Sequence, residues 1–414
     1  MFNYDYLIIG GGIAGTTAAE TLRKNDSAAK IAILEDEKHL LYSRVFLPRF
    51  AMGEIGLDKV MLRTLNDYEK NNIDIFLSER VVKIDFEKKT ADTDSGKNFS
   101  YKKLLIASGG RAEEWQFSDG IKDKVYRLQT LDDALGLKSL FEQKPHGKVL
   151  VVGGGLITLE FLNIFSKYGW EITLLMRERF FWNGLVEERG GELFNKIFLR
   201  GKINVIAGDE VHAIKAEENI LAVRTKGSKI LHADAIAVGV GLKRNLEFAR
   251  GLSTASGIKV DNYLKAGDGV WAAGDVAEYV DPFSGKSKTI GNWTHAFLTG
   301  RIAGINMAGS PAKAGDEEFR STASYSTEVL GAVITIIGEI ALPEAETFVS
   351  LDEVSDKYSR FFLKNGRLIG AFLVNSQQIK PFAAKLIESE KNVSGRENLL
   401  FYESGLKELL RDDT

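Results

Sequence analysis

Two glycine-rich turns are the parts of this sequence whose residue types and spacing most clearly suggest chemistry. Their key positions are Gly10, Gly12 and Gly15 in the first turn, and Gly153, Gly155 and Thr158 in the second. In such a turn the first glycine allows a tight bend, the second lets backbone approach a pyrophosphate, and the third lets helix pack closely on strand. The N-terminus of the following helix offers amide donors and the positive end of its dipole to the phosphates. The sequence therefore predicts two dinucleotide-binding sites in one chain.

The elements around each turn agree with this interpretation. Residues 6–9 and 149–152 are short apolar runs typical of buried strands, and a helical pattern follows each turn. After the first turn another apolar run, 31–34, ends in Glu35, twenty residues beyond Gly15. A carboxylate at this position can accept hydrogen bonds from a ribose diol, so we expect Glu35 to bind the first dinucleotide.

Composition limits the classes of protein to which the chain can belong. Its 414 residues are 44% hydrophobic and 27% charged, as in ordinary globular proteins, and the formal net charge of -3 argues against nucleic-acid binding. No apolar stretch approaches the roughly 20 residues needed to cross a bilayer. The N-terminus lacks the basic flank and cleavage site of a secretory signal, so a cytoplasmic location is expected.

The chain contains no cysteine. This absence excludes disulfide exchange, sulfenic-acid chemistry, thiolate metal sites and cysteine-ligated iron–sulfur clusters. The five histidines show no metal-ligand spacing, so no metal site is predicted.

The order of these patterns predicts an α/β fold with two Rossmann-like dinucleotide-binding domains, the second inserted in the first, and a C-terminal α+β domain. The predicted boundaries are 1–113 with 247–316 for the first domain, 114–246 for the second, and 317–414 for the third. Asn365 and Gly366 lie between two strand-like runs and predict a β-hairpin in the third domain. A leucine-rich helical pattern at 397–410 is expected to pack against the protein itself rather than against a membrane or a partner.

Other predicted strands end in glycine or polar residues, which suits close passage of backbone beside a ligand. These ends are Leu104–Ala107 followed by Ser108 and Gly109, residues 235–240 followed by Gly241, and residues 270–273 followed by Gly274 and Asp275. A further strand, which contains Val81, is expected at Arg80–Ile84.

Over residues 1 to about 375 the chain resembles the FAD-dependent pyridine-nucleotide disulfide oxidoreductase superfamily, in its rubredoxin and ferredoxin reductase branch. The block Ala272–Asp275 is the most specific part of this resemblance. The resemblance implies FAD in the first site and NAD(P)H in the second, with Asp275 bonded to the ribityl chain of the flavin. Cysteines that disulfide-reducing relatives carry after Glu35 are replaced here by residues 41–49, which is the pattern of the electron-carrier reductases.

The resemblance also implies roles for individual side chains. Arg44 would meet the flavin pyrophosphate, Arg49 would face the flavin, and Trp293 would lie beside it. Glu160, expected on the first turn of the second helix, would lie over the flavin beside the nicotinamide as the catalytic partner of Arg49. Because a buried carboxylate is costly alone, we expect Glu160 and Arg49 to be in contact. The remaining positions assigned to cofactor binding are Val81, Ala107, Ser108, Gly109, Gly274 and Gly241.

The second site departs from the family pattern in two ways. Thr158 stands where a third glycine or alanine is usual, which crowds the helix against the strand. Met176 stands where an NAD-preferring relative has its ribose carboxylate, and Arg177 and Arg179 follow it. Loss of the acid beside two arginines suits a 2′-phosphate, so NADPH is favoured over NADH, and a decayed site is the alternative.

Together these features predict an oxidoreductase that passes electrons from NAD(P)H through FAD to a small carrier of the rubredoxin or ferredoxin type. Two alternatives remain open. One is a reductase of a quinone or another small acceptor. The other is a flavoprotein subunit that forwards electrons within a larger complex, and an oligomer is compatible with either.

Overall fold

A computed structural model describes the chain except residues 219, 245, 253, 310–316 and 412–414. It divides into two compact units. The first unit comprises Met1–Phe46, Gly56–Arg111 and Leu242–Ser321, and the second comprises Leu47–Ile55, Ala112–Gly241 and Thr322–Thr414. The second dinucleotide-binding fold is therefore inserted in the first along the chain, which confirms the predicted fold class.

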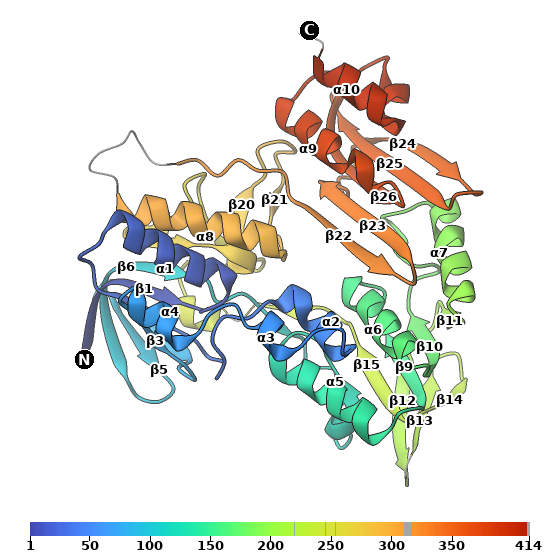
Figure 1. Ribbon diagram of the computed structural model, residues 1–414, viewed down its shortest axis with the longest axis horizontal. Coiled ribbons are helices and arrows are strands. Elements are labelled where there is room, and N and C mark those ends of the chain that lie inside the picture. The colour runs from blue at the N-terminus through green and yellow to red at the C-terminus, as the bar shows by residue number, and fades with distance from the viewer. Residues whose placement is uncertain (219, 245, 253, 310–316, 412–414) are drawn as a thin grey trace. The chain divides into compact units, whose positions relative to one another are not determined.

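The first unit is built on a sheet whose central strands are parallel, in the order β18-β19-β6-β1-β2-β3, of which β6, β1 and β3 are labelled in Figure 1. Its strands are β1 (Phe2–Ile9), β2 (Ile31–Leu34), β3 (Ile73–Phe76), β6 (Asn98–Ile106), β18 (Lys265–Gly267) and β19 (Val270–Ala272). The hairpin β4 (Val81–Asp85) and β5 (Thr90–Thr93) joins this sheet through β6. Central strands such as β2 are buried along their whole length, as expected for a parallel sheet covered on both faces.

Two helices of the first unit cross at close range. α1 (Ile13–Asn25) follows the first glycine turn, and α8 (Trp293–Ala308) lies against it (Figure 1). A Cβ atom on Gly300 of α8 would overlap the carbonyl of Ala14, and one on Gly304 would lie 2.9 Å from the carbonyl of Ala18. Small residues on both helices thus let α8 approach the helix that should bind the pyrophosphate.

The second unit contains a parallel sheet in the order β11-β10-β9-β15-β8. Its strands are β8 (Val125–Tyr126), β9 (Lys148–Val152), β10 (Glu171–Met176), β11 (Asn204–Ala207) and β15 (Ala235–Val238). The helices are α5 (Leu131–Gln143), α6 (Leu156–Lys167) and α7 (Glu188–Arg200). A three-stranded antiparallel sheet, β12 (Val211–Glu217), β13 (Ile220–Thr225) and β14 (Ile230–Ala233), completes this part.

The C-terminal residues of the second unit form a five-stranded antiparallel sheet in the order β22-β23-β26-β25-β24. Its elements are β22 (Ser324–Val329), β23 (Ala332–Gly338), β24 (Glu346–Asp352), β25 (Lys357–Lys364), β26 (Arg367–Val374), α9 (Lys380–Ser389) and α10 (Glu403–Arg411). The predicted Asn365-Gly366 turn joins β25 to β26, with φ of 52° and 72°, the positive values that such a turn requires. The tail helix α10 packs on α9 and buries Leu406 and Leu409, as predicted.

Aromatic side chains join α7 and the segment at Trp182 to the C-terminal sheet. The Trp182 ring lies 5.2 Å from the Phe372 ring of β26 and 5.3 Å from the Phe194 ring of α7. A Cβ atom on Gly190 of α7 would lie 3.1 Å from the Tyr358 ring of β25. The Trp182 segment and α7 thus pack against the C-terminal sheet through apolar side chains.

The remaining elements are short. They are α2 (Leu47–Ala51), α3 (Leu57–Val60), α4 (Leu65–Lys70), β7 (Arg111–Ala112), β16 (Leu242–Lys243), β17 (Ile258–Lys259), β20 (Ala277–Val280) and β21 (Ser287–Lys288), with 3₁₀ turns between them. The segment 47–55, assigned from sequence to the first domain, groups with the second unit, where the Tyr168 hydroxyl donates to the Ala51 carbonyl at 3.0 Å. Among the described residues, no helix has both the length and the apolar character needed to cross a membrane.

Candidate functional site

The first glycine turn is shaped by close backbone packing. Gly10 has φ of 104°, and a Cβ atom there would overlap the carbonyl of Ala107 at the end of β6. A Cβ atom on Gly15 would overlap the carbonyl of Gly10. Gly12, which caps α1, has no described atom within 4 Å of its Cβ position. The turn therefore leaves open space at the N-terminus of α1, where a pyrophosphate could bind.

Glu35 lies directly after β2 and is 8% exposed. It accepts hydrogen bonds from the backbone N–H of Gly11 and, at 3.0 Å, from that of Glu37. Burial raises the pKa of Glu35, and these amide donors oppose the rise. A carboxylate has about four acceptor positions, so Glu35 can still accept from a ribose hydroxyl.

Arg44 lies near this carboxylate in the first unit. Its guanidinium is 2.5 Å from Oε1 of Glu37, and the Tyr42 hydroxyl donates to Oε2 of the same carboxylate at 2.7 Å. The guanidinium also lies 5.1 Å from the centre of the Tyr42 ring. Glu37 and Tyr42 therefore hold Arg44 on the side of the site where Glu35 lies.

The end of β6 contributes a second edge of the first site. Ala107 is buried, and its backbone N–H donates to the Ile9 carbonyl at 2.8 Å. The buried hydroxyl of Ser108 has no hydrogen-bond partner among the described residues, and Gly109 has φ of 61° with open space at its Cβ position. An unpaired buried hydroxyl beside an open glycine indicates a place where a polar ligand is received. Val81 is buried at the start of β4.

Asp275 lies in a 3₁₀ turn, Gly274–Val276, that also reaches α1. Gly274 has φ of 74°, and its Cβ position is 3.1 Å from Cβ of Ala14. The Thr299 hydroxyl accepts from the Gly274 N–H at 3.0 Å, and Arg244 donates to the Asp275 carbonyl at 2.5 Å. Burial raises the pKa of the Asp275 side chain, while the positive charges of Arg244 and Arg44 oppose the rise.

Trp293 is the first residue of α8, whose N-cap is Asn292. The Asn292 side chain accepts from the His295 N–H at 2.8 Å, and its buried Nδ2 has no partner among the described residues. The structure thus brings Glu35, Ser108, Asp275 and the cap of α1 into one unit, as sequence reasoning expected. Arg244 and Thr299 were missed because neither belongs to a recognisable motif.

The second glycine turn repeats this design with one change. Gly153 has φ of 133°, and a Cβ atom there would lie 2.5 Å from the carbonyl of Gly239. Gly155 caps α6 and has open space at its Cβ position among the described residues. Thr158 is fully buried, and its hydroxyl, which has no hydrogen-bond partner in the described part of the chain, lies 3.0 Å from the Cβ positions of both Gly153 and Gly239. The side chain that sequence reasoning expected to crowd the turn therefore fills the space against the neighbouring strand.

The second site has an acidic residue that sequence reasoning missed. Met176 is buried in β10, but Oε2 of Glu178, two residues later, lies 3.1 Å from the Cβ position of Gly154. In the first site Oε2 of Glu35 lies 2.9 Å from the Cβ position of Gly11, the equivalent glycine. The structure therefore places a carboxylate over the second turn, where the sequence had suggested that the acid was lost. Glu178 stands twenty residues beyond Thr158, as Glu35 stands twenty residues beyond Gly15, so the same spacing could have located it.

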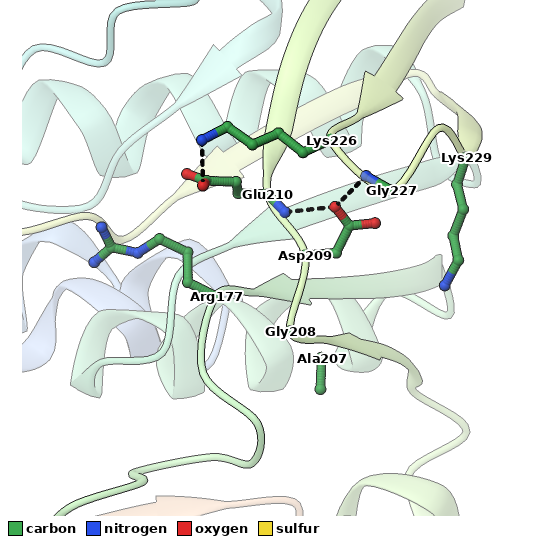
Figure 2. A pocket seen from close by; sticks show the side chains of 8 residues that line it. All are labelled: Arg177, Ala207, Gly208, Asp209, Glu210, Lys226, Gly227 and Lys229. Carbon is green, nitrogen blue, oxygen red and sulfur yellow. Dashed lines mark hydrogen bonds and ion pairs between the residues drawn. The ribbon is translucent and has the colours of Figure 1, made fainter.

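Arg177 and Arg179 have different surroundings. Arg177 lines a cavity of about 370 Å³ with Ala207, Gly208, Asp209, Glu210, Lys226, Gly227 and Lys229 (Figure 2). Lys226 pairs with Glu210 at 2.5 Å on the side of this cavity where Arg177 lies, whereas Lys229 extends to the other side. Arg179 instead forms an exposed ion pair with Glu188. Gly241 has φ of 128°, and its carbonyl accepts from the Glu113 N–H at 3.2 Å.

The predicted contact between Glu160 and Arg49 needs correction. Glu160 is the fifth residue of α6, one position beyond its first turn, and its carboxyl accepts from the Thr327 hydroxyl at 2.8 Å. Burial raises the pKa of Glu160, and the Thr327 hydrogen bond opposes the rise. Nε of Arg49 on α2 lies 3.2 Å from Glu54, with about half of the Arg49 side chain exposed. Arg49 thus pairs with Glu54 on its own segment, near solvent. Glu160 instead accepts a hydrogen bond from the neutral hydroxyl of Thr327.

Comparison with known proteins gives two family matches. A family model described as pyridine nucleotide-disulphide oxidoreductase matches residues 4–300. A second, described as the rubredoxin NAD+ reductase C-terminal domain, matches residues 327–391. The two matches cover the two nucleotide-binding folds and most of the C-terminal sheet.

Individual proteins are similar over nearly the whole chain. An NADH-rubredoxin oxidoreductase of Clostridium acetobutylicum is 28% identical over 402 residues, which are 95% of this chain and 98% of that protein. A 5,5'-dehydrodivanillate O-demethylase ferredoxin reductase subunit of Sphingobium sp. is 27% identical over 99% of both chains. The crystal structure of a ferredoxin reductase from Rhodopseudomonas palustris is 26% identical, with a TM-score of 0.86 over 98% of this chain and 99% of that one.

Proposed function

This chain belongs to the pyridine nucleotide-disulphide oxidoreductase family, and from that premise we propose that it passes electrons from NADH through FAD to a small electron-carrier protein. The observation that carries the proposal is a pair of glycine turns, each with a carboxylate over its middle glycine. Glu35 lies over Gly11, and Glu178 lies over Gly154. Because the chain has no cysteine, electrons cannot pass through a redox disulfide of its own.

The residues of the first unit fit FAD. The open cap of α1 suits the pyrophosphate, and Glu35 suits the adenosine ribose. The unpartnered groups of Ser108 and Asn292 are polar atoms that a large polar ligand would satisfy. Asp275, half-buried in the turn that reaches α1, would bond the ribityl hydroxyls. When bound, FAD supplies the redox centre that takes a hydride from reduced nicotinamide and releases electrons to the acceptor.

Glu160 is proposed to act on the nicotinamide. It lies one turn into the helix whose N-terminus should bind the pyrophosphate of this nucleotide. Loss of a hydride leaves the nicotinamide ring positively charged, so a fixed carboxylate beside it stabilises the transition state. The resemblance to the family implies that Arg49 faces the flavin. We retain this role for Arg49, without a direct bond between Arg49 and Glu160.

NADH is proposed as the preferred nucleotide. The Glu178 carboxylate can accept from a ribose diol as Glu35 does, and it would repel a 2′-phosphate. The names of several relatives specify NADH or NAD(+). Arg177 and Lys226 in the adjacent cavity are the groups that favour NADPH, and Lys226 is already paired with Glu210. We therefore replace the preference for NADPH that the sequence suggested.

A rubredoxin or ferredoxin is proposed as the electron acceptor. The C-terminal sheet matches the domain of rubredoxin reductases, and two relatives that match nearly the whole chain reduce such carriers by name. Anaerobic stopped flow tests this proposal. Holoenzyme reduced with NADH is mixed with oxidised rubredoxin, oxidised ferredoxin or a water-soluble quinone, and flavin absorbance is followed.

For a carrier reductase, one iron–sulfur protein should reoxidise the flavin at a rate that saturates with carrier concentration and exceeds the quinone rate. Faster reoxidation by the quinone would assign a small-molecule acceptor instead. Slow reoxidation by all three would favour a subunit of a larger complex, and purification from the native host should then yield a stoichiometric companion.

A further inference from the structure

One face of α6 is hydrogen-bonded to the C-terminal sheet. Thr327 of β22 donates to Oε1 of Glu160 at 2.8 Å. One turn further along α6, Nδ2 of Asn163 donates to the Glu328 carbonyl at 2.6 Å, and its Oδ1 accepts from the Leu330 N–H at 2.9 Å. Three consecutive contacts thus fix the helix that follows the second glycine turn against one strand and the turn after it.

The Thr327 bond is the side-chain hydrogen bond that the structure gives to Glu160 within the described residues. Without it the Glu160 carboxyl would rotate more freely, because the adjacent contacts of Asn163 fix the helix and not that side chain. Thr327 donates its hydroxyl hydrogen, and an ionised carboxylate is a stronger acceptor than a neutral carboxyl. The hydrogen bond from Thr327 therefore favours one orientation of the Glu160 carboxyl and its ionised form.

We propose that Thr327, a residue of the C-terminal sheet, is the positioning residue that holds Glu160 ionised and correctly oriented toward the nicotinamide. The inference rests on the proposed function, because it assigns Thr327 to the same site. It gives the C-terminal sheet a part in hydride transfer through a single hydroxyl, in addition to its packing against the nucleotide-binding fold.

The charged and titratable groups on elements packed against α6 are few. The elements are α2, β9, β10, β15 and β22. Their ionisable side chains are Arg49 of α2, Lys148 of β9, Glu171 of β10, and Tyr325 and Glu328 of β22. Lys148 and Glu171 pair with each other at 3.3 Å where β9 and β10 begin, and Arg49 pairs with Glu54. Burial raises the pKa of Tyr325 to about 12, so it is neutral at the pH of the test.

Four variants of the holoenzyme test the inference. Thr327→Val removes the hydroxyl and keeps the shape, Thr327→Ser restores a donor, and Glu160→Gln removes the titrating group. Ser326→Ala is the matched control, because the neighbouring Ser326 hydroxyl contacts Thr335 at 2.9 Å and Lys380 at 3.3 Å. Two readouts are measured against pH: the rate of flavin reduction by NADH, and the infrared band of the protonated carboxyl that Glu160→Gln abolishes.

Thr327→Val should raise the proton affinity of Glu160 about tenfold, so that the infrared titration and the acidic limb of the rate profile both move up by about one pH unit. Thr327→Ser should restore both curves, and Ser326→Ala should leave them unchanged. Thr327→Val curves that superimpose on wild type, or an equal shift in Ser326→Ala, would overturn the inference. If NADH does not reduce the wild-type flavin, the proposed function fails, yet the infrared titration still reports whether Thr327 controls Glu160.

Discussion

Glu178 is the residue on which the choice of nucleotide depends in this account. Replacing it with alanine removes two expected hydrogen bonds between a carboxylate and the ribose diol, each with a charged acceptor. We predict a KM for NADH that rises by about tenfold or more, with a KM for NADPH that stays level or falls. Steady-state kinetics with both nucleotides measure this change. The exposed Arg179→Ala is the control, and it should alter neither KM. An unchanged KM for NADH in Glu178→Ala would remove Glu178 from the site.

Asp275 illustrates a conflict between binding and stability. Burial raises its pKa, so its ionised form destabilises the folded apoprotein. We predict that Asp275→Asn raises the unfolding free energy of the apoprotein by about 1 kcal/mol at pH 7 and weakens FAD binding about tenfold. Calorimetry of the apoprotein and a fluorescence titration with FAD check the two parts.

The pH dependence of Asp275→Asn has a definite sign. As pH falls through the raised pKa of the folded state, wild type takes up a proton that the unfolded chain binds only at lower pH. Wild type therefore gains stability there, and the advantage of Asp275→Asn should shrink between pH 7 and pH 5. An advantage that grows as pH falls would show that Asp275 is not destabilised by burial.

At the scale of elements, two glycines of the first turn have different roles: Gly15 matters for folding, and Gly12 matters for binding FAD. A Cβ atom on Gly15 overlaps the Gly10 carbonyl, so Gly15→Ala should lower the unfolding free energy by about 3 kcal/mol. Gly12 has φ of -64° and open space at its Cβ position among the described residues, so Gly12→Ala should change that free energy by less than about 1 kcal/mol. Because its methyl group would occupy the cap of α1, Gly12→Ala should nevertheless lose FAD affinity. Urea unfolding of both apoproteins measures the change in stability, and FAD titrations measure the change in affinity. Tight FAD binding by Gly12→Ala would contradict the assignment of the α1 cap to the pyrophosphate.

Local elements were the part of the fold that sequence could predict. Glycine spacing located both turns, because a backbone overlap such as that at Gly10 depends on a few neighbouring residues. The Asn365-Gly366 hairpin and the packed tail helix α10 followed from equally local patterns. Glu178 was missed because the acid was sought at Met176, the last residue of the apolar strand, although the spacing of twenty residues that locates Glu35 from Gly15 gives Glu178 from Thr158.

At the scale of the whole molecule, the decisive contacts join residues that are far apart in sequence. Thr327 and Glu160 are separated by 167 positions, and Trp182 packs on Phe372. No periodicity or motif specifies such pairs, because they depend on how the C-terminal sheet packs within the second unit. The expected Glu160–Arg49 pair was wrong because Glu160 accepts from Thr327, which lies far away in sequence, whereas Arg49 pairs with Glu54 on its own segment.

The central claim is that one chain binds a pyridine nucleotide and FAD for direct electron transfer without a redox disulfide. Anaerobic titration of the holoenzyme with NADH tests it most directly, with flavin absorbance recorded after each addition. We predict complete bleaching at one NADH per FAD, because the flavin takes one electron pair and the chain has no cysteine to take a second. Flavin that stays oxidised with both NADH and NADPH, or that bleaches only after two equivalents, would contradict the account.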